Sequence, residues 1–252
     1  MKRIFSTIFV AAALLAASVQ ASAQYFDHLS VGVGAGFDGV SLQLAVPMGD
    51  YMQLRAGGSY MPPFSIVKNV KDFEYQEGGT VDLNIRGQLQ ISAFNAMIDF
   101  FPGKKTGFHF TAGVFAGDRT IATAYNTEPY LDEKEWGVSG ITVGNTLITT
   151  DSKGISRVNL DINKFLPYLG IGAGRAARDR AVNFVFDFGA IYTGGLGIYT
   201  KGTNLKTGEE DYIRITSQDI KDNGQDDQGI VDKVYSIPVL PMMKFSLFFR
   251  IF

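Results

Sequence analysis

The stretch Pro241-Met-Met-Lys-Phe-Ser-Leu-Phe-Phe-Arg-Ile-Phe252 decides the fold, because its side chains alternate between two kinds of surface. One face of an extended strand carries Met243, Phe245, Leu247, Phe249 and Ile251, and the other face carries Lys244, Ser246 and Arg250. A strand of a soluble sheet does not normally combine so much aromatic surface with basic groups opposite. The alternation is typical of a strand that faces lipid on one side and a packed polar interior on the other.

The amino-terminal residues have the pattern of a secretory signal peptide. Lys2-Arg3 precede an apolar run from Ile4 to about Ala17, which is too short for a spanning helix, and Ala21-Ser22-Ala23 form a cleavage site. We expect residues 1–23 to be removed and residues 24–252 to form one domain. Together with the terminal strand, this leader predicts export to the bacterial outer membrane.

The composition excludes several classes of function. The absence of Cys excludes disulfides, thiol catalysis and cysteine-based metal sites. Without the leader, the chain has 21 basic and 25 acidic residues and no basic patch, so a nucleic-acid partner is not expected. The 20 Phe and 11 Tyr residues suit a barrel, whose aromatic side chains gather at the membrane boundaries.

Seven further segments show the same alternation as the terminal strand. They are Leu29–Phe37, Val40–Val46, Met52–Ser59, Phe94–Phe100, Phe108–Phe115, Pro167–Gly174 and Val182–Phe188. The expected fold is therefore all-β, an eight-stranded antiparallel up-and-down transmembrane barrel. Short periplasmic turns and long external loops near residues 61–91, 118–165 and 193–237 fit this topology.

Two regions leave the strand count open. Val81–Ile91 alternates cleanly, but its apolar phase shifts before Phe94. A β-bulge near Ser92 would make one long strand that projects beyond the membrane, whereas a separate strand would make a ten-stranded barrel. Ile141–Thr149 and Ser156–Ile162 suggest a hairpin that also extends past the bilayer.

Three motifs carry a resemblance to known proteins. Ile98-Asp99-Phe100-Phe101-Pro102, Pro167-Tyr168-Leu169-Gly170-Ile171-Gly172 and Phe186-Asp187-Phe188-Gly189 are similar to segments of a group of uncharacterised bacterial barrel proteins. The mature chain as a whole resembles the small OmpA- and OmpX-like outer-membrane barrels. The resemblance implies that the barrel assembly machinery reads the terminal strand, although Arg250 stands where such chains usually carry an aromatic residue.

The interior of an eight-stranded barrel is just wide enough to be filled by its own side chains. Counting outward from the turn at Lys104 places Asp99 opposite His109, and the same count across the turn at residues 175–180 places Asp187 opposite Tyr168. We interpret both as structural pairs, since buried ions need partners. A carboxylate beside an imidazole also resembles part of a catalytic dyad.

Enzyme activity is not expected. The two His residues, His28 and His109, both fall at the periplasmic rim, where neither can reach a lipid of the outer leaflet. No cofactor and no metal are expected either.

The expected loops contain two candidate interaction sites. Trp136 could anchor a partner or rest at the lipid–water boundary. Asp222, Asp226 and Asp227 are spaced closely enough for a Ca²⁺ loop but lack the full EF-hand pattern, so a solvated acidic loop is the alternative.

The sequence thus favours a non-enzymatic outer-membrane barrel with a structural role in the envelope. Its expected partners are outer-membrane lipid, lipopolysaccharide, the assembly machinery and a surface ligand of the loops. A narrow channel for small solutes is the first alternative, and a lipid-modifying enzyme is the second.

Overall fold

The computed structural model describes residues 28–74, 80–143, 145–177, 180–208, 210–216 and 237–251. The expected signal peptide and the acidic segment that contains Asp222, Asp226 and Asp227 lie outside these residues. The described part is one antiparallel sheet with a single short 3₁₀ helix, η2 (Glu133–Glu135), so the predicted all-β antiparallel fold is confirmed. Among the described residues, no helix has the length and hydropathy needed to span a membrane.

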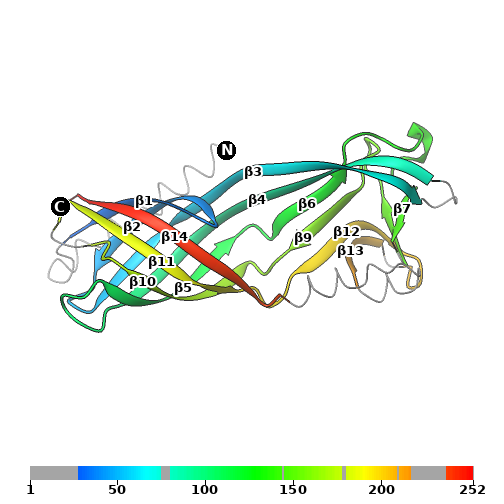
Figure 1. Ribbon diagram of the computed structural model, residues 1–252. Helices are drawn as coiled ribbons and strands as arrows, with labels where there is room; N and C mark the ends of the chain where they lie inside the picture. Colours follow the sequence, from blue (N-terminus) through cyan, green and yellow to red (C-terminus); the bar gives the residue numbers. More distant parts are fainter. Residues whose placement is uncertain are drawn as a thin grey trace.

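Eight strands pair in a closed cycle, which we call the ring (Figure 1). In order around the cycle they are β3 (Met52–Glu74), β2 (Gly39–Pro47), β1 (Ser30–Gly36), β14 (Val239–Arg250), β11 (Val182–Tyr192), β10 (Phe165–Ala173), β5 (Phe108–Gly117) and β4 (Thr80–Phe100). The pairing of β4 with β3 returns the ladder to its start. Every pairing in the cycle is antiparallel.

After Met61 on β3 and before Ile91 on β4, the two strands leave the ring and continue together into a second region, which we call the extension (Figure 1). Its other strands are β6 (Thr120–Asn126), β7 (Gly140–Val143), β8 (Thr146–Thr149), β9 (Arg157–Asp161), β12 (Gly197–Asn204) and β13 (Glu210–Ile215). The sheet runs β3-β4-β6-β9-β12-β8-β7, and β13 pairs with β12. Each of the three segments expected as long loops therefore contains strands of the extension among its described residues.

The hairpin expected between Ile141–Thr149 and Ser156–Ile162 is wrong. Instead, β8 pairs with β7 and β12, whereas β9 pairs with β6 and β12. Each segment alternates correctly for a strand, but alternation does not specify a partner, and β12 is long enough to pair with both.

The irregularity expected near Ser92 lies on the opposite strand. Pairing advances from Met61↔Ile91 to Phe64↔Leu89, so the extra residue belongs to β3, while β4 continues without a break as one strand. Pro62-Pro63 occupy the irregularity, since proline has no N–H to donate to the ladder. The segment Val81–Ile91 is thus not a separate strand.

The phase shift on β4 has a different cause, which is a change in what its two faces contact. In the ring, Phe94, Ile98 and Phe100 are exposed and Asn95 and Asp99 are buried. In the extension, the same outward positions carry Asp82, Asn84, Arg86, Gln88 and Gln90.

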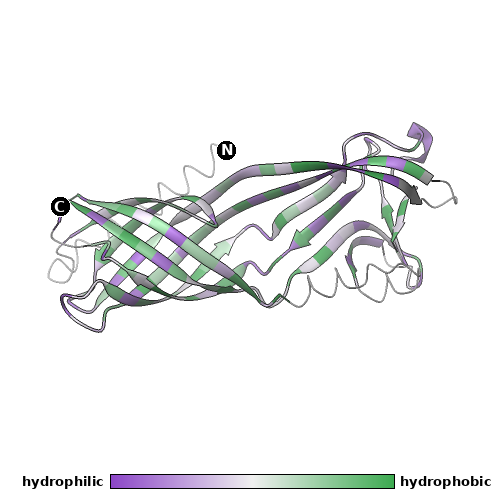
Figure 2. Cartoon of the chain, viewed as in Figure 1, coloured by the Kyte–Doolittle hydropathy of each residue, from purple (hydrophilic) through white to green (hydrophobic). Residues whose placement is uncertain are grey.

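The inward positions change in the opposite sense. Leu83 is buried in an apolar cluster with Ile141, Ile148 and Ile215. Figure 2 shows hydrophobic and hydrophilic segments along the strands of both regions. The strand keeps its pleat, but its outward face changes from apolar in the ring to polar in the extension, and its inward face changes from mixed, with Asn95, Met97 and Asp99, to apolar.

Candidate functional site

Arg55 on β3 lies in the ring interior, and its side chain is fully buried. Its guanidinium pairs with two carboxylates. Nη1 donates to Asp187 Oδ2 at 2.7 Å and Nη2 donates to Asp187 Oδ1 at 2.8 Å. Nη2 also donates to Asp99 Oδ1 at 2.8 Å, and Nε lies 2.7 Å from Asp99 Oδ2. This planar fork joins β4 to β11 across the interior.

Polar side chains satisfy the remaining sides of Asp99. Thr111 donates its hydroxyl to Asp99 Oδ1 at 2.7 Å, and the Gln53 amide donates to Oδ2. The Gln53 carbonyl in turn accepts the backbone N–H groups of Ala176 and Ala177 in the turn that follows β10. The network therefore connects the ring wall to one of its short turns.

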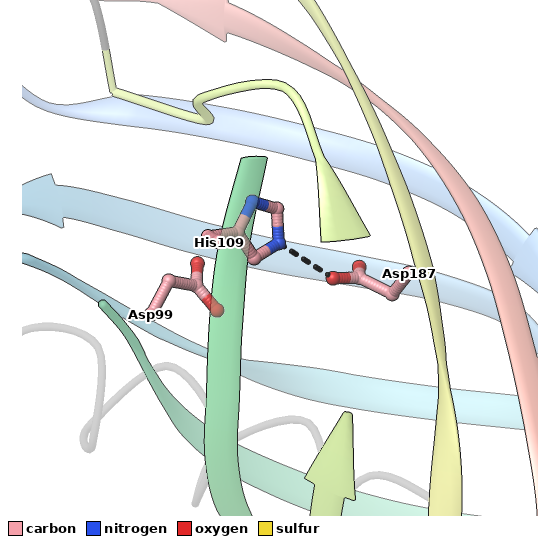
Figure 3. Close-up of side chains that lie close together, drawn as sticks. All are labelled: Asp99, His109 and Asp187. Carbon is pink, nitrogen blue, oxygen red and sulfur yellow. Dashed lines mark hydrogen bonds and ion pairs between the residues drawn. The ribbon is translucent and has the colours of Figure 1, made fainter. Parts of the chain in front are cut away.

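His109 belongs to the same network, but its partner differs from the expected one (Figure 3). Its Nε2 lies 3.2 Å from Asp187 Oδ1 and its Nδ1 lies 3.1 Å from the Gly107 carbonyl. The residue opposite Asp99 on β5 is Thr111, so the predicted Asp99–His109 pairing is wrong. Arg55 links the two carboxylates and thereby brings Asp99 and His109 into one cluster.

The expected hydrogen bond between Tyr168 and Asp187 is also wrong. Asp187 lies opposite Gly172 on β10, whereas Tyr168 lies opposite Ile191. The buried Tyr168 hydroxyl has no hydrogen-bond partner in the described part of the chain, and it packs over Gly170 and Gly189 instead.

Both errors have one physical origin, the position of each turn. If the centre of a hairpin turn moves by one residue, every cross-strand partner changes by two residues. The side chain keeps its face but meets a different neighbour. The turn between β10 and β11 is displaced toward β11, which replaces Tyr168 by Gly172 as the residue opposite Asp187.

The cluster has the donor set of a metal site. One ligand atom from each of Asp99, His109 and Asp187 lies within 4.8 Å of the others. However, Arg55 already engages both carboxylates, and a metal ion would have to displace or face its positive charge. We therefore interpret the cluster as a structural ion network.

A second buried ion pair joins β14 to the turn between β1 and β2. Lys244 Nζ on β14 lies 2.6 Å from Asp38 Oδ2, and both side chains are almost fully buried. The ammonium group also lies 5.7 Å from the centre of the Phe115 ring. Sequence reasoning missed both this pair and the central role of Arg55, although both basic residues occupy inward positions of their strands. An inward basic residue in a filled barrel requires a carboxylate partner.

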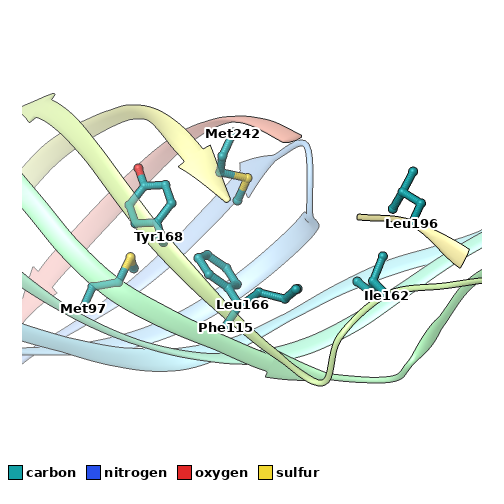
Figure 4. Packing of buried hydrophobic residues seen from close by; sticks show 7 residues of the cluster. All are labelled: Met97, Phe115, Ile162, Leu166, Tyr168, Leu196 and Met242. Atoms are coloured by element: carbon teal, nitrogen blue, oxygen red, sulfur yellow. The ribbon is translucent and has the colours of Figure 1, made fainter. Parts of the chain in front are cut away.

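An apolar layer follows the ionic one (Figure 4). Met97, Phe115, Leu166, Tyr168 and Met242 are buried inside the ring. Phe115 and Tyr168 meet edge to face with ring centres 5.7 Å apart. The layer continues beyond the ring to Ile162 and Leu196, so the interior is filled by charged groups at one level and by apolar groups at the next.

Arg175 holds the three short turns together at the end of the ring nearest the ionic layer. Its guanidinium donates to the backbone carbonyls of Thr106, Asp50 and Gly103 at distances of 2.8–2.9 Å. It also stacks 3.9 Å from the centre of the Phe101 ring. This end of the ring is therefore closed by specific contacts.

Trp136 lies in the extension, between η2 and β7. Its indole N–H donates to the Leu131 carbonyl at 3.0 Å, and Gly154 leaves room for its ring. Asn126 binds the carbonyl of Gly154 beside Trp136, and on β6 it pairs with Ile85 of β4. Ile85 is nine residues along β4 from the exposed Phe94 of the ring, which corresponds to about 30 Å along the strand. In this position Trp136 packs the tip of the extension.

Comparisons with known proteins give the following likenesses. Acinetobacter baumannii CarO aligns over 87% of this chain and 96% of its own, with 16% identity and a TM-score of 0.44. Acinetobacter baumannii CarO2 aligns over 89% and 99%, with 13% identity and a TM-score of 0.48. A major outer membrane protein from Thermus thermophilus aligns over 88% and 98%, with 16% identity and a TM-score of 0.42. No family model and no curated protein matches the chain.

Proposed function

We propose that the chain is a non-enzymatic outer-membrane protein of bacteria, in which the ring is a closed eight-stranded transmembrane barrel. The barrel anchors the extension, which stands outside the cell as a folded interaction surface. The observation that carries the proposal is the change of polarity along the outward face of β4. Apolar side chains on the outward face of a strand suit a lipid surrounding, and polar side chains on that face suit water.

The outer surface of the ring supports a membrane position. Exposed apolar side chains cover strand after strand, and they include Val33, Leu42, Phe94, Phe110, Leu169, Phe184, Phe188, Phe245 and Leu247. On β11, outward positions run from Val182 to Tyr192, which is about 33 Å along the strand. At the usual tilt of roughly 40° this corresponds to about 25 Å across the membrane, the height of the apolar band of such barrels.

The filled interior supports a barrel that does not conduct solutes. Arg55, Asp99, His109 and Phe248 are each 0% exposed, and Phe115 is 2% exposed. A continuous water path would expose at least one side chain at every level. The same burial argues against catalysis at His109, because no substrate reaches its ring.

Cysteine labelling tests the orientation of the ring in the membrane. The chain has no Cys of its own, so only the introduced residue can react. Lys153 lies in an exposed turn of the extension and Lys105 lies in an exposed short turn of the ring. In intact cells, a membrane-impermeant maleimide should label K153C, and it should label K105C only after the outer membrane is permeabilised. Equal labelling of both variants in intact cells would contradict the proposal.

Conductance tests the closed interior. Wild-type protein in planar lipid bilayers should give no stable discrete openings. Reproducible single-channel steps would instead establish the alternative of a narrow channel for small solutes.

A further inference from the structure

One edge of β4 changes its partner where the ring ends. On this edge β4 pairs with β5 up to Ala93↔Gly117 and with β6 from Leu89↔Ala122 onward (Figure 1). Residues 90–92 of β4 and residues 118–121 lie between the two ladders, and the Asp118 N–H donates to the Ser92 carbonyl across them at 3.1 Å. The change of partner therefore interrupts the ladder just beyond the ring.

A pocket of about 390 Å³ lies at this interruption. Pockets that bind small ligands have volumes of roughly 300–1,000 Å³. The apolar residues of its lining are Ile121 and Ala122, which offer little surface to a lipid tail. The other lining residues carry amide, carboxylate, guanidinium or hydroxyl groups, and they are Gln88, Gln90, Asp118, Arg119, Thr120 and Thr123.

Three of these polar side chains are held in place by neighbouring residues. Thr123 donates its hydroxyl to Asn159 Oδ1 at 3.0 Å, and Thr120 donates to Asp161 Oδ1 at 2.7 Å. Arg119 Nε lies 3.2 Å from Asp161 Oδ2, while half of the Arg119 side chain remains exposed. Side chains that are already ordered lose little conformational entropy when a ligand binds.

Other polar groups of the lining remain available to a ligand. In the part of the chain that the structure describes, the side chains of Gln90 and Asp118 make no hydrogen bond and no ion pair. The charges of Asp118 and Arg119 balance, so the lining has no surplus charge that would favour a phosphate or a cation. Donors and acceptors lie side by side in a neutral pocket. This combination suits a sugar, because each of its hydroxyls both donates and accepts.

The pocket faces the space directly above the lipid. Gln90 and Gln88 point to the same side of β4 as Phe94, which is 53% exposed on the outer surface of the ring. They are four and six residues beyond Phe94, which corresponds to about 13 Å and about 20 Å along the strand. The rest of the lining lies near these levels, since Thr123 pairs with Gln88 and Asp118 is hydrogen-bonded to Ser92.

The level of the pocket matches the saccharide of an outer-leaflet glycolipid. At the usual strand tilt of roughly 40°, Gln90 and Gln88 lie about 10 Å and about 15 Å further from the bilayer centre than Phe94. The polar headgroup layer extends roughly 5–7 Å beyond the hydrocarbon. The two amides therefore lie just above the headgroups.

We propose that this pocket binds a sugar of an outer-leaflet glycolipid, the core saccharide of lipopolysaccharide. The inference rests on the proposed membrane orientation of the ring. A glycolipid whose acyl chains lie against the apolar outer surface of the ring carries its saccharide past Phe94 to the level of the pocket. There the amides of Gln88 and Gln90 and the carboxylate of Asp118 bind sugar hydroxyls.

Native mass spectrometry of the full-length protein in detergent tests the proposal, with rough lipopolysaccharide and lipid A as the probes. Rough lipopolysaccharide carries the core sugars and lipid A lacks them, so wild type should bind the former at least about tenfold more tightly. The double variant Q88A/Q90A should lose this preference. N69A removes an exposed amide from the same face of the extension, outside the pocket, and should bind like wild type.

Three other outcomes each overturn the inference. Equal affinity of wild type for the two probes would show that the core saccharide is not recognised. An undiminished preference in Q88A/Q90A would place the saccharide elsewhere on the protein. Equally tight binding of soluble maltoheptaose, lost in Q88A/Q90A, would assign the pocket to free glycans rather than to a glycolipid.

A separate measurement distinguishes failure of the wider proposal. The heat-dependent shift in electrophoretic mobility of a folded barrel should be the same in wild type and Q88A/Q90A. A wild-type chain that does not enter lipid at all would refute the membrane barrel itself, whereas a correctly inserted wild type without preference for rough lipopolysaccharide refutes only the saccharide site.

Discussion

The ring and the extension share two strands, but the ring interior contains an ionic layer and the described core of the extension is apolar. Arg55 on β3 points into the ring and is fully buried among carboxylates. Leu83 on β4 points to the same side of the sheet in the extension and is 2% exposed among aliphatic side chains. The comparison teaches that strand alternation marks two faces but does not specify which face carries the apolar side chains.

The largest expected effect follows from removing the cation of the ring. R55M leaves Asp99 and Asp187 buried without their countercharge, and we expect a loss of about 3–5 kcal/mol in the free energy of unfolding. Urea titration of the protein refolded into lipid vesicles measures it.

The matched control for R55M is R157M in the extension, where the side chain is half exposed and pairs with the partly exposed Asp151. Removing that pair should cost less than about 1 kcal/mol. An equal loss in the free energy of unfolding for R55M and R157M would show that the buried and the exposed ion pairs do not differ in their contribution to stability.

Removing apolar volume from the extension should have a smaller and more local effect. L83A should destabilise the extension by about 2–5 kcal/mol, because it leaves a cavity beside Ile141 and Ile148. Limited proteolysis and hydrogen exchange should report opening of the extension while the ring strands stay protected. L205A, at an exposed turn residue, is the control. Loss of protection in both regions would mean that they unfold as one unit.

A charge on the outer face should distinguish the two surroundings. Leu169 is 69% exposed near the middle of β10, and L169R should cost about 2–4 kcal/mol if lipid surrounds the ring. S65R, at an exposed outward position of β3 in the extension, should change stability by less than about 0.5 kcal/mol. Vesicle refolding titrations of both variants provide the measurement, and a neutral L169R would argue for water around the ring.

The smallest expected effect is a pH dependence at the tip of the extension. Burial acts to raise the pKa of Asp151, but the N–H groups of Lys153 and Ile155 and the Arg157 guanidinium outweigh it. The pKa therefore lies below the ordinary value of 3.8. The stabilisation is complete above pH 3.8 and is lost as the pH falls through the lower pKa of the folded state.

Hydrogen exchange, corrected for intrinsic rates, should show the turn at Asp151–Ile155 opening more at about pH 3 than at about pH 6. D151N has no charge to lose and should show no such difference. A difference of equal size in D151N would assign the pH effect to another group.

Strand positions and faces could be predicted from the sequence, because successive side chains of a strand point to opposite faces whether lipid or water surrounds it. The inward placement of Asp187 and the outward placement of Phe188 follow from that period alone. The contacts of the site could not be read, since Asp187 meets Arg55 from a strand 132 residues distant in sequence. The apolar patterns of Val81–Ile91, Ile141–Thr149 and Ser156–Ile162 predicted strands that project past the bilayer, but they gave no indication that these strands pack around a core of their own.

By itself, the sequence determined an all-β chain in which eight segments alternate polar and apolar side chains, so that each forms a strand with two different faces. Only the tertiary structure decided the register, the partners of the buried charges and the pairing of β9 and β8 with β12. The physical reason is that alternation is a local property of one strand, whereas register and partner depend on where each turn is centred and on which distant strand completes the ladder.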